Sequence, residues 1–136
     1  MPHLVILYTP QLDAEADLPG LCRHLCNTML AARDEAGAQV FPTGGTRVLA
    51  YPAAHSAVAD GQRDYAFIYL NVRMAKGRSA AVHQRVGESL VAAAKEFLAP
   101  LFEQRYLGLT LQIDEGQEVF DSKVSTIHPL FSTGSR

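Results

Sequence analysis

The sequence has no apolar run long enough to span a bilayer, and its N-terminus lacks a basic segment followed by a long apolar stretch. A membrane-spanning helix needs about 20 apolar residues, and a secretory signal needs both of those N-terminal features. We therefore expect a cytoplasmic protein that has no membrane partner.

Strong charge of either sign is also missing. The chain has 12 Lys and Arg side chains against 14 Asp and Glu, which gives a formal net charge of -2 at pH 7. Nucleic-acid binding needs a basic patch or stripe, whereas the basic residues here are scattered along the chain. We expect no nucleic-acid partner, and any arginine that contributes to function should act locally.

Cysteine is scarce, with Cys22 and Cys26 as the only two. Their spacing puts both on one face of a helix, but His24 between them would point elsewhere and no second pair of ligands follows later in the chain. The spacing therefore does not indicate a metal site. Both thiols are expected to pack as small apolar side chains in a reducing compartment.

The length of 136 residues and a hydrophobic content of 48% allow one moderate core, so residues 1–136 should form a single domain. Apolar runs predict strands over residues 3–9, 47–51, 65–73 and 107–113. A helical stripe predicts one helix that begins after the cap Asp17 and ends at Gly37. A second stripe predicts a helix from the cap Ser79 through Leu101.

The two halves of the chain repeat the same order of elements. Aligning Val5 with Ala66 also places Leu18 opposite Ser79. The pseudo-repeats cover about residues 2–60 and 63–115, and a C-terminal docking segment, 116–136, follows. Two βαβ units with right-handed crossovers predict a four-stranded mixed sheet with both helices on one face. The other face then needs a cover, and oligomerisation is the economical source of one.

Strand parity assigns residues to the two faces, because side chains alternate along a strand. The alignment puts the following residues on the helix side: Val5, Leu7, Val48, Ala50, Ala66, Ile68, Leu109 and Leu111. Pro2, Leu4 and Arg47 then fall on the opposite face, with Arg73 as a weaker candidate beside them. If the first and third strands are antiparallel, Pro2 also lies near Arg78, so Pro2, Arg47 and Arg78 should converge on one cavity, within a protomer or across a subunit boundary.

Pro2 becomes the N-terminal residue once Met1 is removed, which is usual before a residue as small as proline. The product carries a secondary amine. An ordinary α-amino group has a pKa of about 7.7–8.0, and burial beside a cation favours its neutral form. Pro2 is therefore a candidate general base. The histidines have no partner visible in the sequence, and we do not expect them to be catalytic.

In combination these residues resemble the 5-carboxymethyl-2-hydroxymuconate isomerase family of the tautomerase superfamily. The resemblance rests on Pro2, Arg47 and the segments 15–21, 41–42, 59–62, 64–67 and 77–79. It covers the chain to about residue 115. It implies an α+β, tautomerase-like fold, a homotrimer of four-stranded sheets, and active sites built from Pro2, Arg47 and Arg78.

The resemblance also implies the chemistry, which is isomerisation of a small unsaturated hydroxy polycarboxylate. The reaction would convert 5-carboxymethyl-2-hydroxymuconate to its 2-oxo-3-ene isomer in homoprotocatechuate degradation. Neutral Pro2 would accept the 2-hydroxyl proton and deliver one to C5, while Arg47 and Arg78 would bind carboxylates and stabilise the dienolate. The reaction needs no metal or organic cofactor.

Three alternatives stay open at this point. The first two are another proline-dependent tautomerase and a hydrolytic dehalogenase of the same superfamily. A dehalogenase would want an acidic residue that activates water, and the sequence shows none on the predicted face of Pro2. The third is a trimeric binding protein that keeps the fold without catalysis.

Overall fold

The structure is a computed structural model that describes residues 2–131. Met1 and residues 132–136, which end the predicted docking segment 116–136, lie outside the described residues. The elements, with η for a 3-10 helix, are β1 (His3–Tyr8), α1 (Leu12–Glu15), α2 (Leu18–Ala31), η1 (Thr43–Gly45), β2 (Arg47–Pro52), β3 (Tyr65–Met74), α3 (Ala80–Phe97), α4 (Ala99–Gln104), β4 (Tyr106–Glu115) and η2 (His128–Phe131).

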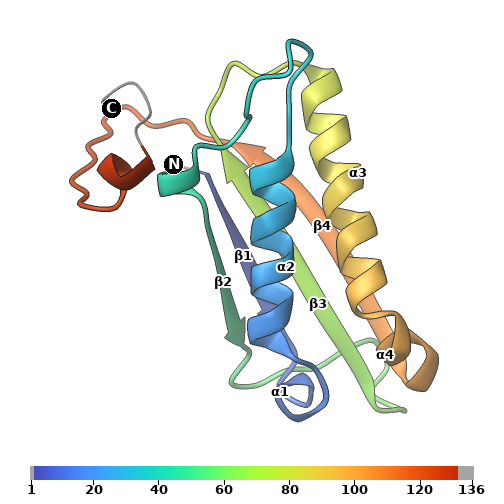
Figure 1. Cartoon of the computed structure of the whole chain (residues 1–136). Helices are drawn as coiled ribbons and strands as arrows, with labels where there is room; N and C mark the ends of the chain where they lie inside the picture. The colour runs from blue at the N-terminus through green and yellow to red at the C-terminus, as the bar shows by residue number, and fades with distance from the viewer. Residues whose placement is uncertain (1, 132–136) are drawn as a thin grey trace.

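One mixed sheet of four strands, in the order β2-β1-β3-β4, forms the frame of the molecule. Strands β1 and β2 are parallel, as are β3 and β4, whereas β1 and β3 are antiparallel with His3 opposite Arg73. The long helices α2 and α3 lie side by side on one face (Figure 1). The predicted sheet of two βαβ units with helices on one face is confirmed.

Both long helices begin at the predicted caps. The Asp17 side chain accepts a hydrogen bond from the backbone N–H of Gly20 at 3.0 Å, and the Ser79 hydroxyl accepts one from that of Val82 at 3.2 Å. Each cap satisfies an N–H group that has no partner within the first helical turn.

The helix ends differ from the prediction. Helix α2 ends at Ala31 rather than Gly37, because Asp34 closes a separate turn by accepting hydrogen bonds from two backbone N–H groups, both at 2.9 Å. Gly37 lies inside this turn with a φ of 80°, which glycine adopts readily. The second predicted helix is divided into α3 and α4, and Pro100 stands in the first turn of α4, where its missing N–H is tolerated.

The faces of β1 are opposite to those predicted. Leu4 and Ile6 are fully buried under the helices, whereas Leu7 is 44% exposed on the other side of the sheet. The predicted helix-side residues of the other strands do pack against the core. The alignment of the repeats was therefore wrong by one residue in β1, which exchanges its two faces. Pro2 is buried on the helix side, not on the face predicted for it.

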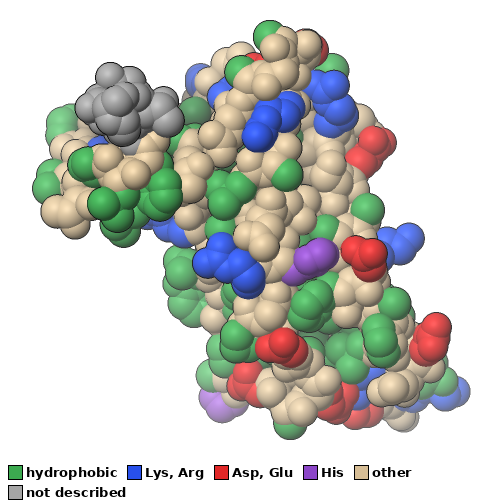
Figure 2. Space-filling model, viewed as in Figure 1, with side chains coloured by type: hydrophobic (Ala, Val, Ile, Leu, Met, Phe, Trp, Pro, Cys, Tyr) green, Lys and Arg blue, Asp and Glu red, His purple; other side chains and the backbone are tan. Residues whose placement is uncertain are grey.

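The uncovered face of the sheet carries exposed apolar side chains, among them Leu7, Leu49 and Tyr51. Figure 2 shows the opposite, helix-covered side, where acidic and basic side chains are interspersed. No helix within residues 2–131 is long and apolar enough to cross a membrane.

The chain beyond β4, residues 116–131, leaves the end of β4 and passes the start of β1 to reach a lobe beside η1 (Figure 1). It begins with a hydrogen bond from the Gly116 N–H to the Met74 carbonyl at 2.9 Å. Near its end, η2 packs against η1 (Figure 1). A Cβ at Gly44 would lie only 2.8 Å from the His128 Cα, so a glycine is needed for this close approach. Hydrophobic side chains gather on this protruding lobe (Figure 2).

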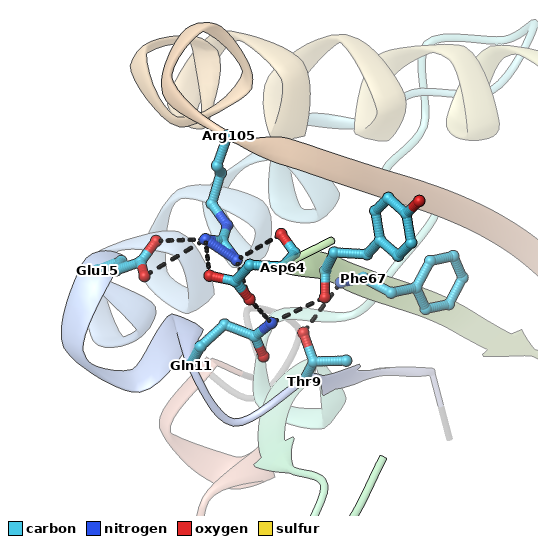
Figure 3. Close-up of polar contacts among 7 residues, drawn as sticks. Thr9, Gln11, Glu15, Asp64, Phe67 and Arg105 are labelled. Atoms are coloured by element: carbon cyan, nitrogen blue, oxygen red, sulfur yellow. Dashed lines mark hydrogen bonds and ion pairs between the residues drawn. The ribbon is translucent and has the colours of Figure 1, made fainter. Parts of the chain in front are cut away.

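At the other end of the sheet, Arg105 joins three segments of the chain (Figure 3). Its guanidinium lies 3.0 Å from the Asp64 carboxylate and 3.3 Å from that of Glu15. Gln11 donates to the same Asp64 carboxylate at 3.0 Å. The Arg105 side chain is only 9% exposed. This network fixes α1 and the beginnings of β3 and β4 relative to one another.

Candidate active site

A cavity of about 260 Å³ lies at the beginning of β1 and is lined by both Pro2 and Arg78. Its apolar walls come from Val40, Phe41 and Met74, which belong to the core. Pockets for drug-sized ligands measure about 300–1,000 Å³, so a space of this size suits a small metabolite.

The strand pairing explains why two residues so distant in sequence meet here. Because β1 is antiparallel to β3, the start of β1 lies beside the end of β3, which is Met74. A short turn then leads to α3 and carries Arg78. Gly77 has a φ of 106° in this turn, a conformation that side chains rarely permit. The predicted proximity of Pro2 and Arg78 is thus present in the structure.

The guanidinium of Arg78 is held by the turn that follows α2. Its Nη2 donates to the Val40 carbonyl at 2.9 Å, and its Nη1 lies 3.5 Å from Oδ2 of Asp34. The backbone N–H of Ala38 chiefly, helped by Arg78, holds the pKa of Asp34 below its usual value. Arginine has five N–H donors, so this arrangement leaves donors for a bound anion.

Arg47 lines a second cavity, of about 630 Å³, between α2, η1 and the C-terminal segment. Arg23 and His128 line the same cavity. Lys123 lines both cavities, which therefore adjoin. Within this single chain, Pro2 and Arg78 share one cavity and Arg47 lines the adjoining one. Convergence of Arg47 with Pro2 across a subunit boundary stays a prediction. Arg73 lies opposite His3 on the other face of the sheet, and it is absent from the described lining of the Pro2 cavity.

Two residues at the Pro2 cavity were not predicted from the sequence. Asp121 and Lys123 both line it from the C-terminal segment. That segment has no period in its sequence, and its apolar content predicted docking but gave no position for its charges. Asp121 also corrects the expectation that no acidic residue lies near Pro2.

Three of the histidines lie away from the described lining of the Pro2 cavity. His24 stacks beside Phe97 with 5.5 Å between ring centres, and His83 lies 3.2 Å from the Glu115 carboxylate. His128 is half-buried against Gly44, and its two ring nitrogens are buried without a hydrogen-bond partner among residues 2–131. None of these three lines the described part of the Pro2 cavity.

Comparison with known proteins gives one consistent result. A family model for 5-carboxymethyl-2-hydroxymuconate isomerase matches residues 2–131. A 5-carboxymethyl-2-hydroxymuconate Delta-isomerase of Escherichia coli is 34% identical over 131 residues, which are 96% of this chain and 99% of the relative.

Two solved structures agree with this result. A crystal structure of a 5-carboxymethyl-2-hydroxymuconate delta-isomerase is 55% identical, with a TM-score of 0.93 over 97% of this chain and 93% of the other. A 5-carboxymethyl-2-hydroxymuconate isomerase from Deinococcus radiodurans R1 is 34% identical, with a TM-score of 0.84 over 96% of this chain and 93% of the other. The similarity therefore extends over almost the whole chain.

Proposed function

The chain belongs to the 5-carboxymethyl-2-hydroxymuconate isomerase family, a family of enzymes in the tautomerase superfamily, and from this premise we propose that it converts 5-carboxymethyl-2-hydroxymuconate to its 2-oxo-3-ene isomer in homoprotocatechuate degradation. The observation that carries the proposal is the cavity shared by Pro2 and Arg78. It combines a candidate base with a cation on apolar walls, which suits proton transfer on a small anionic acid.

Pro2 acts as both base and acid in this proposal. Removal of Met1 exposes its secondary amine. The neutral amine takes the proton of the 2-hydroxyl group, and the resulting ammonium returns a proton to C5. Because Arg78 and the apolar walls disfavour a second positive charge, the amine stays neutral before the reaction begins.

Arg78 binds a carboxylate of the substrate and stabilises the charge that develops on the dienolate oxygen. The hydrogen bond to Val40 and the ion pair with Asp34 fix its position before the substrate arrives. Such preorganised donors contribute about 2–4 kcal/mol of transition-state stabilisation.

Arg47 binds a further carboxylate from the adjoining cavity. The proposed substrate is a tricarboxylate, so its charged groups extend beyond the reacting carbons. Lys123 lies between the two cavities, and this adjacency supports participation of Arg47 within the same protomer. Participation across a subunit boundary remains the other arrangement.

The active form in this proposal is a cytoplasmic homotrimer of single domains. Each domain, residues 1–136, consists of two βαβ pseudo-repeats, and the segment after residue 115 docks against them. The exposed Leu7, Leu49 and Tyr51 support association through the uncovered face of the sheet. The free thiols of Cys22 and Cys26 agree with a reducing compartment.

The test is a pH profile of dienol ketonisation for protein shown by mass spectrometry to lack Met1. Pro2→Ala replaces the secondary amine by a primary one, whose ordinary pKa is about 7.7–8.0, so it should shift the ionisation of the free enzyme and lower kcat/KM. Arg78→Ala should lower kcat/KM about 30- to 1,000-fold. An unchanged rate together with an unchanged pH profile in Pro2→Ala would refute the assignment of the base. Activity only on other enol acids would indicate another proline-dependent tautomerase.

Hydrolytic dehalogenation is a second candidate, which the position of Asp121 favours. Asp121 lines the cavity of Pro2, and in this candidate function its carboxylate activates a water molecule there. Halide release from a 3-chloroacrylate, lost in Asp121→Asn, would establish this activity. Absence of halide release from the wild-type protein would reject it.

A further inference from the structure

We propose that Lys123 binds a carboxylate remote from the reacting carbons and thereby selects polycarboxylates over monocarboxylates. The inference deepens the proposed function and rests on it. Its starting point is the position of Lys123, which lines both the Pro2 cavity and the cavity of Arg47. A ligand that is anchored at Arg78 and extends toward Arg47 passes from one cavity lined by Lys123 into the other.

Charge balance within the site favours Lys123 as the anion-binding group. The charge of Arg78 is partly compensated by Asp34 at 3.5 Å. Lys123, in contrast, forms no ion pair within 4.0 Å among residues 2–131. Asp121 is the one carboxylate on the described lining of the Pro2 cavity, against the two cations. The cavity is thus positively charged overall, and its least compensated charge is that of Lys123.

Apolar side chains border both cavities. The buried Val40, Phe41 and Met74 form the walls on the side of Pro2, and the exposed Ile127 and Phe131 line the cavity on the side of Arg47. The buried walls lower the local dielectric constant on the side of Pro2, and Coulomb attraction grows as this constant falls, whereas solvent partly screens the charge of the exposed Lys123. The ammonium of lysine is a compact point charge, suited to a carboxylate that arrives from several angles.

The described part of the C-terminal segment is fixed on both sides of Lys123. Before it, the Gly116 N–H donates to the Met74 carbonyl. After it, His128 packs closely against Gly44, and the Ser125 hydroxyl closes a local turn by accepting hydrogen bonds from the backbone N–H groups of Ile127 and His128 at 3.0 and 3.1 Å. Lys123 therefore lies between two fixed points of a segment that lines both cavities.

The first test uses two unreactive probes that share a six-carbon diene chain, muconate with two carboxylates and sorbate with one. Dissociation constants are measured by calorimetry for wild type, Lys123→Met and Lys123→Arg. We expect Lys123→Met to weaken muconate binding about tenfold, the scale of one charge-assisted hydrogen bond, and to leave sorbate within about twofold. Lys123→Arg should keep most of the preference, because it keeps the charge.

Lys95→Met is the matched control, since it removes the same charge from α3 and leaves the lining of both cavities unchanged. Lys123 is exposed, so its substitution should leave the melting temperature unchanged, and this measurement accompanies each titration. Equal weakening of both probes in Lys123→Met, or a wild-type protein without a preference for muconate, would overturn the proposal.

Kinetics separate this inference from the proposed function. With 5-carboxymethyl-2-hydroxymuconate, Lys123→Met should raise KM and change kcat little, whereas a monocarboxylic dienol should show no change in KM. If the wild-type protein converts neither dienol but prefers muconate through Lys123, the proposed function fails and the inference stands. If turnover depends on Pro2 but Lys123→Met prefers muconate over sorbate as strongly as wild type does, only the inference fails.

Discussion

Oδ2 of Asp34 lies 3.5 Å from Nη1 of Arg78, so the turn after α2 and the start of α3 are joined at the candidate active site. The Arg78 side chain is 34% exposed and that of Asp34 is 20% exposed. The pair is thus partly screened by solvent, and it moderates the charge of Arg78 without neutralising it.

Substitution of Asp34 should therefore separate the charge of Arg78 from its position. Asp34→Asn keeps an oxygen that accepts from the turn N–H groups but removes the compensating charge, so we expect KM to fall about two- to fivefold. Asp34→Ala also removes the acceptor, which loosens the turn and should raise KM. Steady-state kinetics of both variants test this, and a raised KM in Asp34→Asn would contradict it.

Acid should destabilise the protein partly through Asp60. The backbone N–H of Gln62 chiefly, with the Tyr65 hydroxyl, lowers the pKa of Asp60 from its ordinary value of 3.8. A carboxyl group whose pKa is lower in the folded state than in the unfolded state stabilises the fold. This contribution is fully present at pH values above the unfolded-state pKa, and it is lost as the pH falls through the folded-state pKa.

The measurement is the urea midpoint at about pH 5.5 and at about pH 3. Asp60→Asn should lose less stability over this interval than wild type, because its side chain does not titrate. Asp121→Asn is a control, because it removes a carboxylate that does not accept the hydrogen bonds that Asp60 accepts from Gln62 and Tyr65. Equal pH dependence of wild type and Asp60→Asn would show that Asp60 does not contribute.

Arg105 should stabilise the fold without affecting catalysis. Its partners Glu15 and Asp64 are 39% and 71% exposed, so they can be resolvated when the arginine is lost, and we expect Arg105→Met to cost about 1–2 kcal/mol in unfolding free energy. Arg105→Lys should recover only part of this unfolding free energy, because an ammonium group does not bind both carboxylates as the planar guanidinium does.

Denaturant titration measures this cost, and kcat/KM serves as the control. The network lies at the end of the sheet away from Pro2, since β1 and β3 are antiparallel, so kcat/KM should stay within about twofold at a temperature where the variant is folded. A large fall in kcat/KM with unchanged stability would assign Arg105 a different role.

Local signals predicted much of the fold. Asp17 and Ser79 cap the helices as expected, because a cap depends on neighbours within one helical turn. The end of α2 was predicted less well. It depends on Asp34, whose side chain closes a turn through hydrogen bonds that residue type alone does not specify.

The faces of β1 could not be read from its sequence. Residues 4–7 are all apolar, so the run has no alternation with polar residues, and only the repeat alignment assigned its faces. In the structure Leu4 lies opposite Val48 and both face the helices. An error of one residue in the alignment was enough to put Pro2 on the wrong face.

The proximity of Pro2 and Arg78 could be predicted because strand pairing alone determines it. The antiparallel contact of β1 and β3 brings Pro2 to Arg78. The positions of Lys123 and Asp121 depend on how an aperiodic segment packs against the rest of the chain, and no sequence pattern describes such packing.

The uncovered face of the sheet should be the subunit interface. Leu49 is 43% exposed there, on the edge strand β2 and close to Tyr51, which is 49% exposed. A lysine in an apolar interface would lose the hydration of its ammonium group. Leu49→Lys should therefore lower the mass of the assembly, as measured by light scattering. Phe102→Lys is the control, because Phe102 is similarly exposed, at 38%, but lies on α4.

The activity of the dissociated Leu49→Lys protein then locates Arg47 in the mechanism. If Arg47 acts from the adjoining cavity of its own protomer, the dissociated variant should keep most of its kcat/KM, and adding Arg47→Ala should lower kcat/KM as much as it does in the undissociated protein. If Arg47 acts in a neighbouring subunit, dissociation alone should cost as much as Arg47→Ala, and the two substitutions together should cost no more than either one. A monomeric wild-type protein would refute the interface, and its activity would then have to come from one chain.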